Sequence, residues 1–331
     1  MRTEIKILLL ASCTLLLFAQ CSTDDTITSY KEQQELVETT LAVDLPQVGF
    51  TRAEPKYDSS KGALYNLNNS DSVYFILWYK PQQNNKEYKV AKKKICIDEA
   101  KEKGCGFTIQ LIKGIDYQFK VWAGFYEQGD VAPTHINIEI PSNPEKGDAY
   151  YGEATFNSTD FSNQKCSIHL KRPLTKIRYY LIDFSQEHYN FYTNLLKQKD
   201  YLITEFDLFF NDIDINKEEW GYKVERNKSN RYNPKKVFTL DKTKILILST
   251  YLYLPELTIP AVNYYSEDPI DLFLHLPEID LSKDTDNKPV TTLANKLVTI
   301  KLSAYELTVL KVVIDNDFDN NYDLNNVDNM K

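Results

Sequence analysis

The 331-residue sequence contains few of the residues that build catalytic, nucleotide-binding or metal-binding sites. It has ten glycines and four isolated histidines, none of them in a paired ligand spacing such as His-Glu-x-x-His. It contains no Gly-x-Ser-x-Gly elbow, no phosphate loop and no dinucleotide fingerprint. The sequence therefore indicates no catalytic residue, no cofactor site and no metal site, and we expect a protein that is not an enzyme.

Positive charge is also scarce. The chain has 47 acidic against 39 basic residues, which gives a formal net charge of -8. An extended positive field is the electrostatic signature of nucleic-acid binding. We therefore expect no nucleic-acid partner.

Cysteines are few and uneven in their placement. Cys13 and Cys21 lie near the N-terminus, which leaves Cys96, Cys105 and Cys166 in the body of the chain. Cys96 and Cys105 could close a small loop in an oxidising compartment, or all three could be incidental, and their spacing does not match a zinc site. The sequence leaves the pairing open.

A hydrophobic run long enough to span a bilayer is missing as well. The apolar run at 7–18 follows Arg2 and Lys6, and it is shorter than the roughly 20 residues that a membrane span needs. Charge followed by a short apolar segment is typical of a secretory signal. Because the run ends just before Cys21, we predict a lipoprotein signal peptide over residues 1–21 with Cys21 acylated, and a plain signal peptide is the alternative. A polar linker over residues 22–35 follows.

The body of the chain is predicted to be mostly β. Short segments rich in Tyr, Phe, Val, Ile and Thr recur between turn residues, as in β-sandwiches. They are found at residues 73–79, 106–112, 117–123, 136–140, 176–182, 245–254 and 297–302.

Other segments set the expected limits of the domains. Turn residues at 150–164 suggest a boundary, which gives domains at 36–163 and 164–318 and a polar tail at 319–331. Helical spacing predicts helices over residues 187–199 and 30–38. Residues 220–234 are expected to form a long polar loop that carries Trp220, the one tryptophan nominated as an exposed binding residue.

Four landmarks appear in a recognisable order: Trp122-Ala123 at the end of a strand, Asp148-Ala149-Tyr150, Leu170-Lys171-Arg172-Pro173, and an apolar strand from Leu307. With the acylated cysteine and its acidic neighbours at 24–25, this order resembles that of the fimbrillin-like, type V pilin-related surface lipoproteins of Bacteroidetes. The resemblance implies two transthyretin-like β-sandwich domains in tandem. It also implies a role in surface fimbriae or adhesion, at the outer membrane or in a fimbrium.

The resemblance further implies assembly by strand exchange. A protease would cut between Arg52 and Ala53, the strand within residues 39–50 would leave, and a strand from another subunit would replace it. Leu41, Val43 and Leu45 alternate as a strand with one buried face would. The donor strand is expected at residues 306–314, with one face formed by Leu307, Val309, Lys311 and Val313 and with both faces covered.

Two outcomes at Arg52 stay open, cleavage and a strand that remains permanently in place. The expected partners are other fimbrial subunits through β-strand complementation, the outer membrane through the lipid, and surface ligands of host or bacterial cells. An alternative function is a glycan-binding surface lipoprotein that uses exposed aromatic side chains such as Trp220. An enzyme built on scattered carboxylates is the third alternative.

Overall fold

The computed structural model describes 14 stretches of the chain. They are residues 35–46, 60–68, 71–83, 87–126, 144–163, 165–198, 205–215, 220–232, 240–241, 244–266, 272–284, 286–304, 308–315 and 318. Cys21, Arg52, Ala53 and Leu307 lie outside the described residues, as does the strand expected at 136–140. The acylation and cleavage predictions therefore stay predictions.

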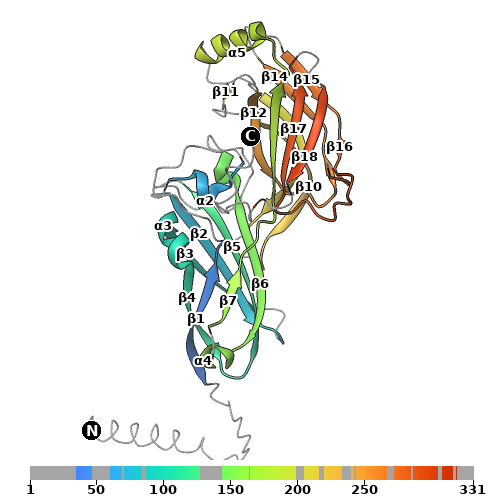
Figure 1. The fold of residues 1–331 in the computed structure, drawn as a ribbon. Helices are drawn as coiled ribbons and strands as arrows, with labels where there is room; N and C mark the ends of the chain where they lie inside the picture. The colour runs from blue at the N-terminus through green and yellow to red at the C-terminus, as the bar shows by residue number, and fades with distance from the viewer. Residues whose placement is uncertain are drawn as a thin grey trace, which may run out of the picture. The chain divides into compact units, whose positions relative to one another are not determined.

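The N-terminal half folds into two sheets (Figure 1), and alternating or β-branched residues supply most of its strands. The larger sheet is antiparallel and has the order β3-β2-β5-β6. The smaller has the order β4-β1-β7. Their bounds are β1 Leu36–Asp44, β2 Ser72–Pro81, β3 Lys89–Cys96, β4 Cys105–Ile112, β5 Asp116–Tyr126, β6 Ala149–Asn157 and β7 Ser167–His169.

Both of these sheets contribute side chains to one hydrophobic core. Phe75 on β2 and Phe119 on β5 meet Leu41 on β1 and Leu111 on β4, and all four are buried. Ile168 on β7 belongs to the same core. The N-terminal half is therefore a β-sandwich.

The C-terminal half also consists of paired strands, arranged around a second core. A five-stranded sheet has the order β11-β12-β8-β17-β18, a four-stranded sheet has the order β10-β9-β14-β15, and β13 pairs with β16. The bounds are β8 Thr175–Ile182, β9 Glu205–Asp214, β10 Lys223–Tyr232, β11 Leu240–Asp241, β12 Lys244–Leu252, β13 Thr258–Ile259, β14 Val262–Ser266, β15 Leu272–Leu276, β16 Ile279–Asp280, β17 Leu297–Ser303 and β18 Val309–Asp315.

The few helices are short. They are α2 Ala63–Asn66, α3 Ile97–Lys103, the 3-10 turn η1 Pro144–Gly147, α4 Asp160–Asn163 and α5 Gln186–Gln198. α3 carries acidic residues in its first turn and lysines in its last, which suits the helix dipole, and it ends at Gly104 with a positive φ of 66°. α5 confirms the helix predicted at 187–199.

The prediction of a mostly β fold with two sandwiches is confirmed, and six of the predicted strands are present within one to three residues of their expected limits. Two local predictions are wrong. Residues 36–38 belong to β1 rather than to a helix. Residues 223–232, expected in a polar loop, form β10, because pairing with β9 satisfies the backbone of a strand that has almost no apolar side chains.

The predicted domain limit at 163/164 does not coincide with the limit of the first core. Cys166, Ile168 and Leu170 pack in that core, and β7 pairs with β1 in parallel. A third buried cluster combines Trp78 and Trp122 from the first half with Ile213 and Tyr251 from the second. Contacts join both halves into one compact unit, Val37–Lys331.

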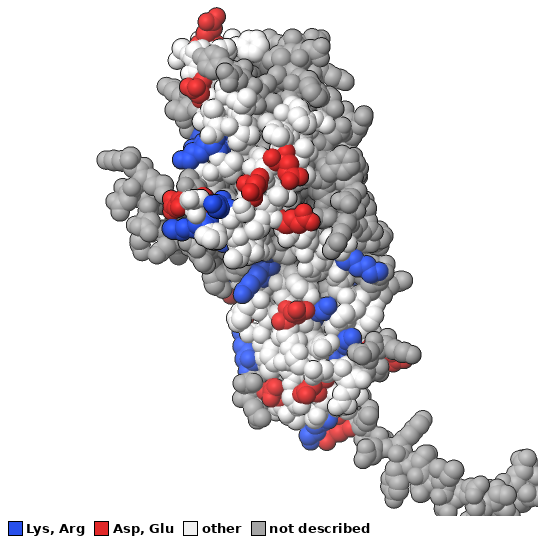
Figure 2. Space-filling model, turned by 90° about the vertical axis from the view of Figure 1, so that its right-hand side faces the viewer, with Lys and Arg blue, Asp and Glu red and all other residues white. Residues whose placement is uncertain are grey.

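The surface of this unit carries charges of both signs. On the face shown in Figure 2, acidic and basic side chains are interspersed among uncharged ones. The described residues of this face therefore form no broad patch of one charge sign.

Candidate functional site

The first candidate feature is the position of β1, which lies between β4 and β7. Its partner β7 runs parallel to it, with Ala42 opposite Ser167 and Val43 opposite Ile168. A strand in this position uses the hydrogen-bonding groups of both its edges. Its removal would leave two new edges in the sheet.

The side chains of β1 also fill part of the first core. Leu41 and Val43 are 0% exposed and Leu45, just after the strand, is 6% exposed, whereas Thr40 on the opposite face is exposed. The alternation predicted from the sequence is therefore confirmed. The three apolar side chains of Leu41, Val43 and Leu45 therefore anchor β1 in the first core.

Gly104 brings the start of β4 close to β1. Its φ of 66° and ψ of -151° lie in a region that only glycine adopts readily. A Cβ atom at this position would lie 2.5 Å from the Val43 carbonyl oxygen. We call the place of β1 between β4 and β7 the seat of β1. The seat of β1 therefore depends on the glycine that connects α3 to β4.

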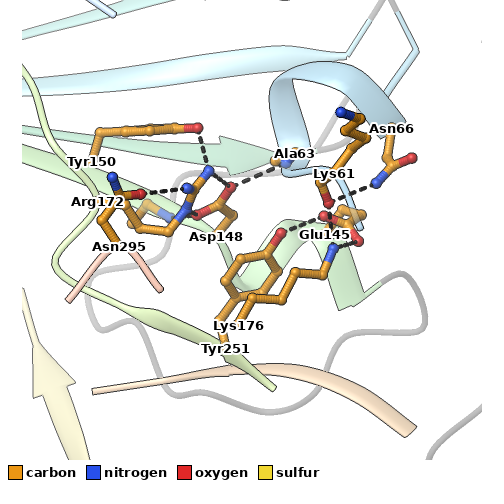
Figure 3. Close-up of polar contacts among 11 residues, drawn as sticks. Lys61, Ala63, Asn66, Glu145, Asp148, Tyr150, Arg172, Lys176, Tyr251 and Asn295 are labelled. Atoms are coloured by element: carbon orange, nitrogen blue, oxygen red, sulfur yellow. Dashed lines mark hydrogen bonds and ion pairs between the residues drawn. The ribbon is translucent and has the colours of Figure 1, made fainter. Parts of the chain in front are cut away.

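The second feature is a pair of buried ion pairs at the junction of the two halves (Figure 3). Arg172 binds Asp148 through Nε and through Nη2, the latter at 2.9 Å from Oδ2, and both side chains are fully buried. Arg172 also donates to the Tyr150 hydroxyl and, at 3.0 Å, to Oδ1 of Asn295. This bidentate geometry is the strongest form of an arginine–carboxylate contact.

The second ion pair joins Lys176 on β8 to Glu145 in η1. The Tyr251 hydroxyl donates to the other Glu145 oxygen, and Lys176 also donates to the Lys61 carbonyl. Burial raises the pKa of Tyr251 well above its usual value. Burial also lowers the pKa of Lys176, although Glu145 opposes that shift.

Both ion pairs hold the segment at α2. The Asp148 carboxylate accepts a hydrogen bond of 3.0 Å from the Ala63 backbone N–H, and Lys176 binds the Lys61 carbonyl (Figure 3). Gly62 packs so closely against the Arg172 guanidinium that a Cβ atom would collide with it. We define Glu145, Asp148, Arg172 and Lys176 as the junction cluster. It ties α2 to both halves of the chain.

The contacts of the junction cluster indicate a structural role rather than a catalytic one. Each carboxylate faces a buried cation and further donors, so neither is placed as a free base. No group of three His, Cys, Asp or Glu side chains among the described residues could hold a metal ion. The sequence identifies Asp148, Tyr150 and Arg172 as family landmarks but does not identify Glu145. Nothing in the spacing of these residues shows that their side chains meet.

The third feature is the predicted donor strand. β18 is an edge strand of the five-stranded sheet and pairs with β17. Val309 faces Leu302 and Lys311 faces Lys301, so Leu310 is an extra residue in a β-bulge. A bulge shifts the alternation by one residue.

The shared face expected for Val309, Lys311 and Val313 is therefore wrong. Val309 and Val312 pack on the second core and Ile314 is buried, while Lys311 is exposed and Leu310 is 50% exposed. The expectation that both faces of this strand are covered is also wrong, because Leu310 and Lys311 are exposed to solvent.

The three described cysteines are free thiols. Cys96 is exposed at the end of β3, whereas Cys105 and Cys166 are buried in the first core. Burial raises the pKa of Cys105 to about 11. The structure therefore answers the open question about Cys96 and Cys105, which do not pair.

The last feature is the surface around Trp220. This side chain is half-buried rather than exposed, and it lies just before β10. Its ring contacts Tyr88, with 5.8 Å between the centroids. It also borders a hollow of about 500 Å³ over β5 and β6. The structure thus keeps Trp220 as a candidate binding residue but places it in the wall of a hollow.

No helix of the described residues is long and apolar enough to cross a membrane. None of the curated protein sequences matches the chain.

The chain is similar to several solved structures. A proposed polysaccharide-binding protein from Bacteroides thetaiotaomicron is 14% identical with a TM-score of 0.44, over 84% of this chain and 96% of that one. A proposed adhesin from the same organism is 13% identical with a TM-score of 0.42, over 85% and 96%. The fimbrial anchor protein Mfa2 from Porphyromonas gingivalis is 10% identical with a TM-score of 0.39, over 84% and 95%.

The names of these neighbours describe a polysaccharide-binding protein, an adhesin and a fimbrial anchor protein, all from Bacteroidetes. At such low identity and TM-score the likeness is distant. A family model matches a stretch of the chain that includes β1, the junction cluster and Trp220. Its pattern matches residues 31–255, and the chain belongs to this family, the family of unknown function DUF6562.

Proposed function

We propose that this chain is a non-enzymatic surface subunit, a fimbrial subunit or fimbrillin-like lipoprotein, that assembles with other subunits by exchanging β1. The observation that carries the proposal is the seat of β1, where Leu41 and Val43 are fully buried and two neighbouring strands flank the backbone. An empty seat would expose apolar pockets and two unpaired edges. A donated strand would restore both kinds of contact, which is the basis of β-augmentation.

The position of Arg52 supports a cut that would free β1. β1 ends at Asp44, before Arg52, and α2 begins at Ala63, after it. A cut between Arg52 and Ala53 would therefore separate β1 from the rest of the body. The junction cluster would still hold the new N-terminal segment through Lys61 and Ala63.

The proposed donor is β18. It is an edge strand, so its release breaks backbone pairing with β17 alone. Its apolar side chains Val309, Val312 and Ile314 would supply the contacts in a neighbouring subunit. The edge strand β3, by contrast, carries Lys89, Lys92, Lys93 and Lys94, and lysines on an edge oppose pairing with another strand.

Cys21 gives the proposal its location. If Cys21 is acylated, the lipid anchors the uncut chain in the outer membrane and leaves together with β1 after a cut. If Arg52 is not cut, the same lipid fixes the molecule permanently, as in an anchor subunit. Surface ligands of host or bacterial cells would then be met by a tethered protein.

An arginine-specific protease tests the proposal on the secreted chain, with Arg52→Gln as the matched control. We expect a product that begins at Ala53 by mass analysis, followed by assembly into larger species in size-exclusion chromatography. The control should stay uncut at this position and monomeric. A wild-type chain that remains a monomer after cleavage at Arg52 would rule out strand exchange, and one that resists cleavage there would rule out the processing step.

A second candidate function is the capture of a glycan at the cell surface. The specific observation in its favour is the hollow of about 500 Å³ beside Trp220, a volume typical of small-molecule sites. Aromatic side chains at such sites supply apolar contact area to sugars. This function is compatible with strand exchange, because the hollow lies over β5 and β6 and does not include β1.

A further inference from the structure

The hollow beside Trp220 is lined by directly paired residues of two strands. Gln118 lies opposite Thr155 and Lys120 lies opposite Glu153, across β5 and β6. Each pair presents polar side chains on the same face of the sheet. The floor of the hollow therefore offers an amide, a hydroxyl, a carboxylate and an ammonium group.

Trp220 is fixed at the side of this floor by its sequence neighbour. Gly221 has a φ of 85°, and a Cβ atom there would lie 3.1 Å from Cδ of Lys120. A glycine is therefore needed for the chain to turn beside the lysine stem. Trp220, the residue before this glycine, lines the hollow.

Two lysines bring positive charge to the indole. The Nζ atoms of Lys80 and Lys120 lie 4.6 Å and 5.2 Å from the Trp220 ring centroid. Neither forms an ion pair with a carboxylate of the described residues. The Glu153 carboxylate accepts a hydrogen bond of 3.2 Å from the Tyr151 hydroxyl. Among the described side chains, the hollow is therefore lined by the ammonium group of Lys120 and the carboxylate of Glu153, and the ammonium group of Lys80 lies beside them over the Trp220 ring.

We propose that this hollow binds an acidic sugar, one that carries a carboxylate or sulfate group. Lys80 and Lys120 would bind the anionic group, and the indole of Trp220 would contact the apolar face of the ring. Gln118 and Thr155 would bind hydroxyl groups. This inference rests on the second candidate function, glycan capture, and is independent of strand exchange.

Isothermal titration calorimetry on the secreted chain tests the proposal with three probes: trigalacturonic acid, its neutral counterpart galactotriose, and a sulfated galactose trisaccharide. We expect binding of an acidic probe and at least tenfold weaker binding of the neutral one, because the neutral probe has no anionic group for the lysines to bind. Added salt should weaken binding. The two acidic probes distinguish uronic from sulfated sugars.

Lys120→Gln should lower the affinity for the acidic probe roughly tenfold, and Trp220→Ala should abolish measurable binding. Lys288→Gln is the matched control, because Lys288 is an exposed lysine paired with Asp286 that does not line the hollow. Thermal melting identifies any variant that loses its fold, and Lys120→Gln keeps the test valid if Trp220→Ala unfolds.

Each alternative result has a distinct meaning. Equal affinity for the neutral and acidic probes, lost in Trp220→Ala, would overturn the acidic specificity and leave glycan capture standing. Equal losses in Lys120→Gln and Lys288→Gln would show nonspecific attraction and overturn the site. If none of the three probes binds, the acidic-sugar site is overturned, and a broad array of neutral glycans then decides whether glycan capture also fails.

Discussion

The seat of β1 and the junction cluster hold the molecule together by different physical means. β1 is retained by apolar side chains and regular backbone pairing, both of which any strand of suitable pattern could supply. The junction cluster is retained by charged groups in one specific geometry, with both ion pairs fully buried. Under the proposed strand exchange, the contacts of β1 would change partner and those of the junction cluster would stay.

The two kinds of contact differ in what a replacement strand or side chain must supply to restore them. Hydrophobic burial is non-directional, so a new strand restores most of the free energy if its side chains fit. A buried charge whose partner is lost keeps its full desolvation cost. An assembly that exchanges strands would therefore need both kinds of contact, one to change and one to keep the subunit folded.

The largest expected effect comes from breaking the junction cluster. Arg172→Met leaves the Asp148 carboxylate buried without its cation, and we expect a loss of about 3–5 kcal/mol in the free energy of unfolding. Urea denaturation measures this change. The double variant Arg172→Met with Asp148→Leu should recover part of the loss, because it removes the unpaired buried charge but leaves the Ala63 N–H without its acceptor. If the single variant is as stable as the wild type, the cluster is not a permanent tie.

Shortening an apolar side chain of β1 should have the next largest effect on the free energy of unfolding. Leu41→Ala should destabilise the chain by roughly 2–5 kcal/mol, because it leaves a cavity in the first core. Thr40→Ala, on the exposed face of the same strand, is the control and should change little. A synthetic β1 peptide added to the chain after cleavage at Arg52 should restore stability, whereas no peptide should rescue Arg172→Met.

A smaller effect is expected at the connection beside β1. Gly104→Ala forces a side chain into a glycine-only conformation and against the Val43 carbonyl, at a cost of roughly 1–3 kcal/mol from backbone strain plus the clash. Gly114→Ala is the matched control, because Gly114 has a φ of 77° and no neighbour within 4 Å. Equal losses of melting temperature in both variants would mean that the β1 contact adds nothing.

Alkaline pH should weaken the aromatic cluster that both halves share. Tyr222 packs against the buried cluster that contains Trp78 and Trp122. Burial raises the pKa of Tyr222 from 10.0 to about 12, so the folded chain keeps this proton while the unfolded chain loses it. Stability should therefore fall as the pH rises from 10 to about 12. Circular dichroism during a pH titration measures the fall, and Tyr222→Phe should reduce its slope. An unchanged slope in that variant would assign the pH dependence to other groups.

The smallest expected effect is a change in the reactivity of the Cys105 thiol, which reports whether β1 is in place. Because it is buried and its pKa is raised to about 11, Cys105 should resist thiol reagents at neutral pH while Cys96 reacts. Cys105 belongs to the same core as Leu41. In a Cys96→Ser background, mass spectrometry should detect labelling of Cys105 after cleavage at Arg52 and not before. No labelling after the cut would mean that β1 stays in its seat.

Local patterns alone determined the mostly β class, most strand positions and the buried face of Leu41, Val43 and Leu45. These features follow from the period-two alternation of side chains along a strand, which is visible in any short window. The same reasoning failed at β10, since this polar segment forms a strand through backbone pairing with β9 and shows no apolar alternation in its sequence. It failed at β18 because a single bulged residue, Leu310, reverses the alternation.

Only the tertiary structure decided how distant residues meet. Arg172 reaches Asn295, 123 positions away, and Tyr251 reaches Glu145, 106 positions away. Trp220 meets Lys80 and Lys120 in the same way, from the opposite half of the chain. A sequence pattern records which side a residue faces, but the partner on that side is set by sheet order and loop path. For this reason the buried face of β1 could be predicted from the sequence, whereas the junction cluster could not.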